Sequence, residues 1–297
     1  MSLTTAFDRL PGVVRGGIWM MSAALCFTVM TALIRETAAQ IHPVEIAFFR
    51  AATNLVLMLP FAFRMGRGLF RSANHRAYGF RGLVGFTFQM SYFPGAAMIA
   101  VAESQALIFT APLWATMMAV TFLGERLYRH RAVALIVGFA GALIILRPGF
   151  ETVSIGSLLV LIAALANATS HVIVTYTTRS DHPDQAVFYL ALYSTPLAAI
   201  AAAFVWRTPN LEQLGLLVAI GALATLNQRF QSRAFASADA TAVLPFDFVR
   251  LPFAGIIGIV ALAELPDPWV WAGGVVIFAA SVYLARCEAR ASRRPPP

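Results

Sequence analysis

The chain has 297 residues, of which 59% are apolar and only 12% are charged, and its mean hydropathy is +0.72. Soluble domains typically carry about 25% charged residues, so this composition excludes a soluble globular protein. The net charge of +8 comes from 22 basic residues, all arginine, which lie between apolar stretches and at the chain ends. Such arginines are expected to contact the lipid bilayer rather than nucleic acid.

Ten apolar stretches of about the length needed to cross a bilayer predict an all-α polytopic membrane protein with ten transmembrane helices. In chain order the stretches are 16–34, 44–63, 82–101, 104–124, 132–146, 155–176, 185–206, 214–230, 240–263 and 268–285. The fifth stretch is shorter than the others, and the ninth contains two charged residues.

The arginines also predict the orientation of the chain. If the N-terminus is cytoplasmic, the inside segments hold 17 of the 22 arginines, including Arg76, Arg81, Arg229 and Arg233. An excess of arginine in short loops marks the cytoplasmic side. We therefore expect both termini in the cytoplasm of a bacterium, with the chain in the inner membrane, and an even number of spans.

The membrane-spanning pattern occurs twice, about 140 residues apart. The matching pairs are His42-Pro43 with His182-Pro183, Ala23-Ala24-Leu25 with Ala163-Ala164-Leu165, and Pro112 with Pro252. Five spans per copy is an odd number, so the second copy enters the bilayer inverted, as in many secondary transporters. The predicted units are a cytoplasmic segment 1–15, a first repeat 16–147, a second repeat 152–285 and a basic cytoplasmic tail 286–297.

Several short motifs recur in both copies. The first copy has Ala100-Val101-Ala102-Glu103-Ser104, Pro112-Leu113, Leu123-Gly124-Glu125-Arg126, Gly138 and Gly141. The second has Ala236, Ala238, Ala240, Pro252, Glu264 and Gly273-Gly274, but Ala263 stands where the first copy has glycine before the glutamate. This ordered set resembles the EamA repeat of the drug/metabolite transporter superfamily, and it covers nearly the whole chain.

The resemblance implies a ten-helix transporter made of two EamA repeats. Similar proteins export amino acids or other small metabolites, and some import metabolites such as nucleosides or S-adenosylmethionine. The resemblance does not assign a solute.

Two charges in the ninth stretch are the first candidates for a substrate site. A charge at mid-bilayer costs from about 2.5 kcal/mol upward, so it should face protein or water. Arg250 lies about 15 Å into the stretch, and Asp247 lies three residues earlier on the same helix face. Either Arg250 binds a solute carboxylate and Asp247 an amino group, or the two form an internal ion pair that positions the helix.

Arg50 lies about 10 Å into the second stretch. We interpret it as a partner of Glu45 or as an arginine that reaches toward the outer surface, with cavity lining as the alternative. In the sixth stretch, Asn167 and His171 are four residues apart and share a face. His171 either relays protons or forms a hydrogen bond between helices.

Other polar and aromatic residues within the stretches are candidates for the wall of a substrate cavity. They are Asn54, Gln89, Tyr92, Trp114, Tyr189, Tyr193, Asn227 and Gln228. A cavity of aromatic rings and a few amides would accept medium-sized zwitterionic or apolar solutes.

These features predict a secondary transporter of small metabolites, foremost an amino-acid exporter of broad specificity that works by alternating access. Import of a metabolite is the alternative, and an intramembrane enzyme is disfavoured because the 14 acidic residues are scattered singly. No phosphate-binding loop indicates ATP, and Cys26 and Cys287 have no metal-ligand neighbours in sequence, so we expect no cofactor or metal. Proton coupling or uniport, and a monomer or homodimer, stay open.

Overall fold

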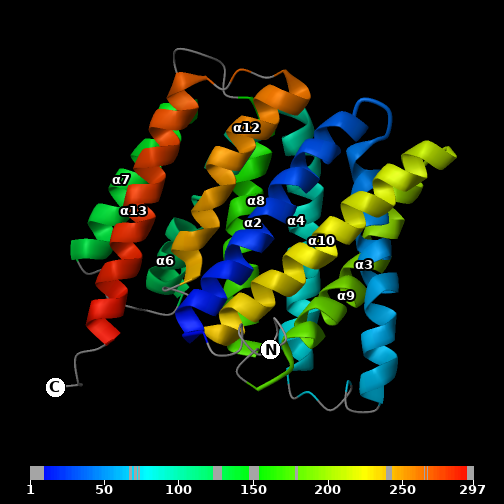
Figure 1. Cartoon of the computed structure of the whole chain (residues 1–297), viewed down its shortest axis with the longest axis horizontal. Helices are drawn as coiled ribbons and strands as arrows, with labels where there is room; N and C mark the ends of the chain where they lie inside the picture. The colour runs from blue at the N-terminus through cyan, green and yellow to red at the C-terminus, as the bar shows by residue number, and fades with distance from the viewer. Residues whose placement is uncertain are drawn as a thin grey trace.

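The structure is a computed structural model that describes residues 10–66, 69, 72, 74–122, 129–146, 154–177, 180–238, 243–263, 265 and 267–292. These residues form a helical bundle with no strand among them (Figure 1). The elements are α2 (Gly12–Thr37), α3 (Pro43–Met65), α4 (His75–Met98), α5 (Val101–Ile108), α6 (Ala111–Phe122), α7 (Arg129–Leu146), α8 (Ile155–Thr177), α9 (Pro183–Ala203), α10 (Leu211–Ser237), η2 (Leu244–Val249), α12 (Arg250–Leu262) and α13 (Pro268–Ser292). Of the recurring motifs, residues 123–126 and Glu264 lie outside the described part.

The helices coincide with the ten predicted stretches, which confirms the fold class. In the described residues, four helical segments are long and apolar enough to cross a membrane on those criteria alone: α2, α3, residues 155–174 of α8, and α9. The other helices are shorter, or they carry polar and basic residues that lower their hydropathy.

Two stretches predicted as continuous helices are broken. The fourth divides into α5 and α6, and the ninth changes from the 3-10 helix η2 to α12 at Arg250. Pro112 and Pro252 lie in the first turns of α6 and α12. Proline is tolerated there because the first amide groups of a helix have no partner within it. The prediction of unbroken helices was therefore wrong at equivalent points of the two copies.

The helix α4 begins seven residues before the predicted stretch, so Arg81 is helical and only 1% exposed. The expectation that Arg81 lies in a cytoplasmic loop was wrong. Arg229 and Arg233 likewise lie on α10 rather than in a loop. A hydropathy window stops at such charges, whereas the folded bundle supplies hydrogen-bond partners that keep them inside helices.

The two copies, called here the first repeat (12–146) and the second repeat (155–292), have the same helix pattern. Helix ends lie 140 residues apart at Thr37 and Thr177, at Pro43 and Pro183, and at Phe122 and Leu262. The cap of α3 and the cap of α9 are also alike. His42 Nδ1 accepts a hydrogen bond from the amide of Val44 at 3.3 Å, and His182 Nδ1 accepts one from the amide of Asp184 at 3.2 Å.

Equivalent helices of the two repeats run in opposite directions. Arg35, in the last turn of α2, donates to the carbonyl oxygen of Ile99, and Gly156, in the first turn of α8, packs against the side chain of the same residue. The end of α2 therefore lies beside the start of α8. Figure 1 also shows that α2 begins and α13 ends at one end of the bundle. Which side of the membrane that end faces stays a prediction.

Helix packing follows the same two-fold relation. The helix α2 packs along α10, and its equivalent α8 packs along α4. The pair α3 and α9 and the pair α7 and α13 each join one helix to its own equivalent. At the second pair, a Cβ on Gly141 would lie 2.9 Å from the carbonyl oxygen of Gly273, so glycine permits the close approach.

Candidate functional site

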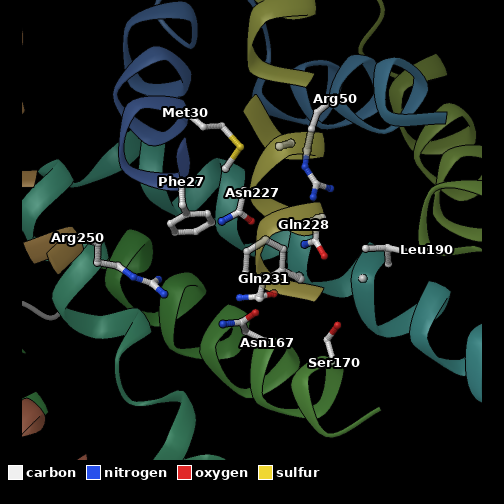
Figure 2. A pocket seen from close by; sticks show the side chains of 13 residues that line it. Phe27, Met30, Arg50, Asn167, Ser170, Leu190, Asn227, Gln228, Gln231 and Arg250 are labelled. Atoms are coloured by element: carbon white, nitrogen blue, oxygen red, sulfur yellow. The ribbon is translucent and has the colours of Figure 1, made fainter. Parts of the chain in front are cut away.

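A narrow cavity lies between the two repeats at the middle of the bundle (Figure 2). Helices α2, α3 and α4 of the first repeat and α8, α9, α10 and α12 of the second repeat contribute to its wall. The lining residues are Phe27, Met30, Arg50, Gly85, Phe88, Asn167, Ser170, Leu190, Ala224, Asn227, Gln228, Gln231 and Arg250. Concave sites with a few convergent polar groups are the usual location of small-molecule binding.

The two walls of the cavity differ in polarity. Apart from Arg50, the first repeat contributes apolar groups, whereas the second repeat contributes most of the amides and a hydroxyl. Several facing residues occupy equivalent positions 140 residues apart: Phe27 and Asn167, Met30 and Ser170, Arg50 and Leu190, and Phe88 and Gln228. The shared backbone thus presents aromatic side chains from one side and hydrogen-bonding side chains from the other.

Arg250 forms a buried ion pair with Asp247 at the junction of η2 and α12. Both side chains are almost fully buried, and the Arg250 Cζ lies 5.1 Å from the ring centroid of Phe27 and 4.7 Å from that of Phe109. The internal ion pair considered from the sequence is therefore present. Because Arg250 also lines the cavity, the ion pair and a substrate role are compatible.

Arg50 lies inside the bundle and is 4% exposed. Its Nε has no hydrogen-bond partner, and no carboxylate within the described part of the chain forms an ion pair with it. Glu45, the expected partner, instead accepts a hydrogen bond from the backbone amide of Arg207 at 3.2 Å. The expectation of a Glu45 pair or a surface-seeking side chain was wrong because α3 packs against α9 and α10 and turns Arg50 inward.

Arg81 is a buried residue that the sequence interpretation missed. Its Nε donates to Ser170 Oγ at 3.2 Å, one terminal nitrogen donates to Gln228 Oε1 at 3.2 Å, and the other donates to the carbonyl oxygen of Ala186. Arg81 thus holds two lining residues of the second repeat in place. Its spacing of four residues from Gly85 is a helical signal that would have been visible with a longer α4.

Five predicted site residues meet at the cavity: Arg50, Asn167, Asn227, Gln228 and Arg250. The Nδ2 of Asn227 donates to the carbonyl oxygen of Ala23 at 2.8 Å, which fixes the orientation of its amide. Ser170, Gln231 and the apolar lining residues were not among the predicted site residues. Aromatic residues are common in this chain, so sequence spacing could not single out Phe27 or Phe88.

The remaining predicted residues do not line the cavity. Asn54 is buried on α3, Gln89 donates to the carbonyl oxygen of Gly85 at 3.1 Å, and Trp114 donates to Thr110 Oγ1 at 3.1 Å. The ring of His171 packs edge-on against Phe235, and its Nε2 has no hydrogen-bond partner among the described residues.

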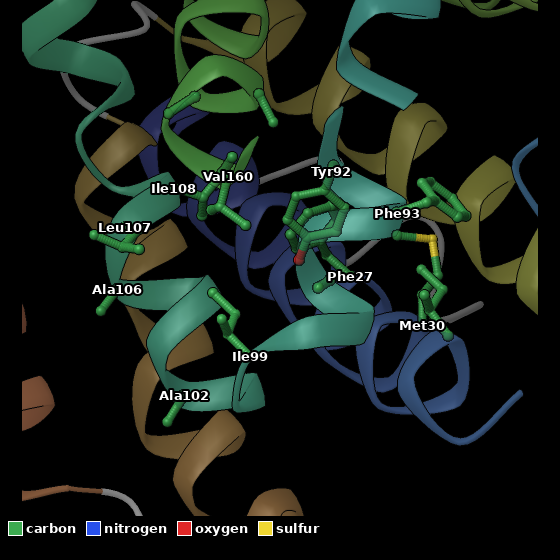
Figure 3. Close-up of a cluster of buried hydrophobic side chains, with 14 of the residues drawn as sticks. Phe27, Met30, Tyr92, Phe93, Ile99, Ala102, Ala106, Leu107, Ile108 and Val160 are labelled. Atoms are coloured by element: carbon green, nitrogen blue, oxygen red, sulfur yellow. The ribbon is translucent and has the colours of Figure 1, made fainter. Parts of the chain in front are cut away.

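Tyr92 supports the cavity from behind. Its ring stacks on Phe88 at 5.1 Å and packs against Phe27 at the same centroid distance. Its hydroxyl forms hydrogen bonds with Thr31 Oγ1 at 2.8 Å and Gln105 Nε2 at 3.2 Å. Figure 3 shows Tyr92 within the large buried cluster that includes Phe27 and Phe93. Tyr92 therefore holds the aromatic wall in position.

Tyr189 and Tyr193 lie toward the end of the bundle that holds the α8–α9 turn. Tyr189 stacks between Tyr78 and Tyr193, and its hydroxyl donates to the carbonyl oxygen of Leu69 at 2.9 Å. Tyr193 is 37% exposed. These rings connect the repeats but do not contact the cavity.

Asp181 in the α8–α9 turn links the repeats at this end. It accepts hydrogen bonds from Ser72 at 2.6 Å, Tyr78 at 2.7 Å and Asn74 at 3.1 Å. Burial opposes ionisation of Asp181, but these hydrogen bonds outweigh it and lower the pKa of the carboxyl below its usual value. The turn of the second repeat is thereby bound to the α3–α4 connection of the first.

Comparisons with known proteins agree with this geometry. The family described as "EamA-like transporter family" matches residues 14–147 and again residues 154–286. A riboflavin transporter of Brucella anthropi is 31% identical over 86% of this chain and 93% of its own length. A pseudopaline exporter of Pseudomonas aeruginosa is 30% identical over 92% of this chain and 96% of its own length.

An S-adenosylmethionine uptake transporter of Rickettsia felis is 26% identical over 97% of this chain and 98% of its own length. A solved crystal structure superposes with a TM-score of 0.65 at 15% identity, covering 94% of this chain and 99% of that one. The structural likeness supports the fold alone.

Proposed function

The chain belongs to the EamA-like transporter family, and on that premise we propose that it carries carboxylate-bearing metabolites, foremost amino acids, outward across a bacterial inner membrane. The carrying observation is the cavity between two oppositely directed repeats, lined by residues of both. A site at such an interface can be opened to each side in turn by movement of one repeat against the other. Cytoplasmic termini belong to the same proposal.

The charged and amide groups support recognition of an amino acid. The guanidinium groups of Arg50 and Arg250 supply donors for a carboxylate, and arginine suits the two oxygens of that group. Asn227 donates its Nδ2 to Ala23, so its amide oxygen is left to accept a hydrogen bond from a solute amino group.

Contacts between the repeats at both ends of the bundle would open alternately. At the end with the α8–α9 turn, the hydrogen bonds of Asp181 to the first repeat would break. At the opposite end, Ser157 donates to Glu103 at 2.6 Å and joins α8 to α5. The changes of helix at Arg250 and between α5 and α6 are suited to act as hinges, because backbone regularity is already interrupted there.

Import of a metabolite is the second candidate function. It is favoured by the Rickettsia felis relative, which is named an uptake transporter, whereas the Pseudomonas aeruginosa relative is named an exporter. Relatives of both directions make the direction of net flux a property to measure in cells.

Counterflow of radiolabelled amino acids into proteoliposomes that contain purified protein tests the proposal. Unlabelled amino acid inside should drive transient accumulation of label, and Arg250→Ala should abolish it. Arg76→Ala is the matched control because Arg76 is exposed on α4. Absence of counterflow for every amino acid, or unchanged kinetics in Arg250→Ala, would overturn the proposed solute class or the role of Arg250, respectively.

A further inference from the structure

The region of the cavity holds more positive than negative charge. Arg50 and Arg250 line the cavity, and Arg81 binds two of its lining residues. All three side chains are buried. Within the described part of the chain, Asp247 is the one carboxylate that forms an ion pair with any of them. Three arginines and one aspartate leave two positive charges without a carboxylate partner, and buried charge of this kind is costly unless something compensates it.

The three arginines differ in what they can offer a ligand. Arg81 spends its donors on the neutral oxygens of Ser170, Gln228 and Ala186. Arg250 is paired with Asp247. Arg50 has an Nε without a partner among the described residues, and its side chain extends into the cavity (Figure 2). Arg50 is therefore the donor best placed to meet an incoming anionic group.

The apolar wall adds a second requirement. Phe27 and Phe88 both pack on Tyr92, whose hydroxyl is anchored by Thr31 and Gln105, so the two rings have fixed support. The facing wall carries the amides of Asn167, Gln228 and Gln231. A solute that satisfies both walls has a flat apolar body on the phenylalanine side and polar atoms along the opposite edge.

We infer that the solute is an amphipathic organic anion: a molecule of net negative charge with a flat, apolar or aromatic body and a carboxylate or phosphate that binds Arg50. This inference rests on the proposed function and narrows it, because a zwitterion would leave both uncompensated positive charges in place. It excludes solutes of net positive charge.

A charge series on one carbon skeleton tests the inference. Phenylpyruvate, phenylalanine and phenethylamine share a phenyl ring and carry net charges of about −1, 0 and +1 at neutral pH. Pyruvate keeps the charge of phenylpyruvate and lacks the ring. Binding to purified protein in nanodiscs is measured by titration calorimetry. Phenylpyruvate should bind at least about tenfold more tightly than each of the other three, because each lacks a charge or an apolar contact.

Variants assign the effect to the residues named. Arg50→Gln should weaken phenylpyruvate binding by about tenfold to a hundredfold, which corresponds to loss of a charged hydrogen bond, and should remove most of its advantage over phenylalanine. Phe88→Leu should reduce the advantage over pyruvate and leave the charge preference. Arg76→Gln, exposed on α4, is the matched control and should bind as the parent does. Thermal unfolding of each variant shows that it is folded.

Equal or tighter binding of phenylalanine or phenethylamine would overturn the inference, as would unchanged binding in folded Arg50→Gln or no binding of any of the four compounds. The proposed function fails separately. If the charge series binds in the expected order but no compound shows counterflow in proteoliposomes, the site is an anion site and transport is refuted. If counterflow of amino acids occurs without the anion preference, transport stands and the inference falls.

Discussion

The two repeats share a backbone but differ in the side chains that face the cavity. Helix ends, proline positions and histidine caps recur at a spacing of 140 residues. At the cavity, the same spacing pairs Phe27 with Asn167 and Phe88 with Gln228. Conservation of the backbone pattern sets where the cavity lies, and divergence of the lining residues sets what the cavity can bind.

The buried arginines show the same asymmetry more sharply. Positions 140 residues from Arg50, Arg81 and Arg250 hold Leu190, Gly221 and Thr110. Each arginine therefore faces an uncharged equivalent in the other repeat. Substitutions that make the repeats more alike, or that disturb one of them alone, test how much of the protein's stability and binding depends on this difference.

The largest effect is expected at the ion pair of the second repeat. Asp247→Leu, which introduces the residue found at position 107, leaves Arg250 buried without its carboxylate and should lower the free energy of unfolding by about 3–5 kcal/mol. Asp247→Leu combined with Arg250→Thr should recover most of the loss, because no isolated charge remains. Chemical unfolding in detergent measures both, and equal stability of the single and double variants would contradict the prediction.

Arg81→Met tests the arginine that joins the repeats. The substitution removes donors from Ser170, Ala186 and Gln228 and leaves their oxygens buried, so we expect a loss of about 2 kcal/mol in stability. Solute affinity should also fall, since Ser170 and Gln228 line the cavity. Arg76→Met is the exposed control on the same helix, with an expected change within about 0.5 kcal/mol. Equal effects of the two variants would contradict a positioning role for Arg81.

Gly221→Ala tests the position equivalent to Arg81. A Cβ there would lie 2.4 Å from the Cβ of Thr53, so α10 and α3 would have to separate. We expect a loss of about 1–3 kcal/mol from overpacking. Gly215→Ala, on the same helix with open space around it, should instead stabilise α10 by up to about 1 kcal/mol. Thermal unfolding of the pair measures the difference, and similar shifts in both would refute the packing argument.

The smallest effect is expected at Ala263, where the second repeat departs from the glycine pattern of the first. Ala263 ends α12 in a left-handed conformation with φ 51° and ψ 28°. Glycine adopts this conformation without the Cβ clash, so Ala263→Gly should stabilise the protein by about 1 kcal/mol. A lowered unfolding temperature would show that the methyl group contributes a contact that outweighs the strain.

Some site residues could be predicted from the sequence because burying them in a membrane has a known cost. Arg50, Arg250 and the amides Asn167, Asn227 and Gln228 stand out in apolar stretches, and all five line the cavity. Arg81 could not be recognised, because a hydropathy pattern ends the third span before it and assigns it to a loop. The tyrosines at 189 and 193 were expected in the wall, but they lie at the end of the bundle, since helical spacing does not distinguish one depth or face from another.

By itself, the sequence determined the membrane class, the two repeats and their family, because hydropathy, proline positions and caps act locally along the chain. Only the tertiary structure decided which faces of seven helices meet, that Arg50 points inward without Glu45, and that Arg81 connects the repeats. The reason is physical: the cost of burying a charge depends on partners that come from distant parts of the chain, and those partners are set by packing between the repeats.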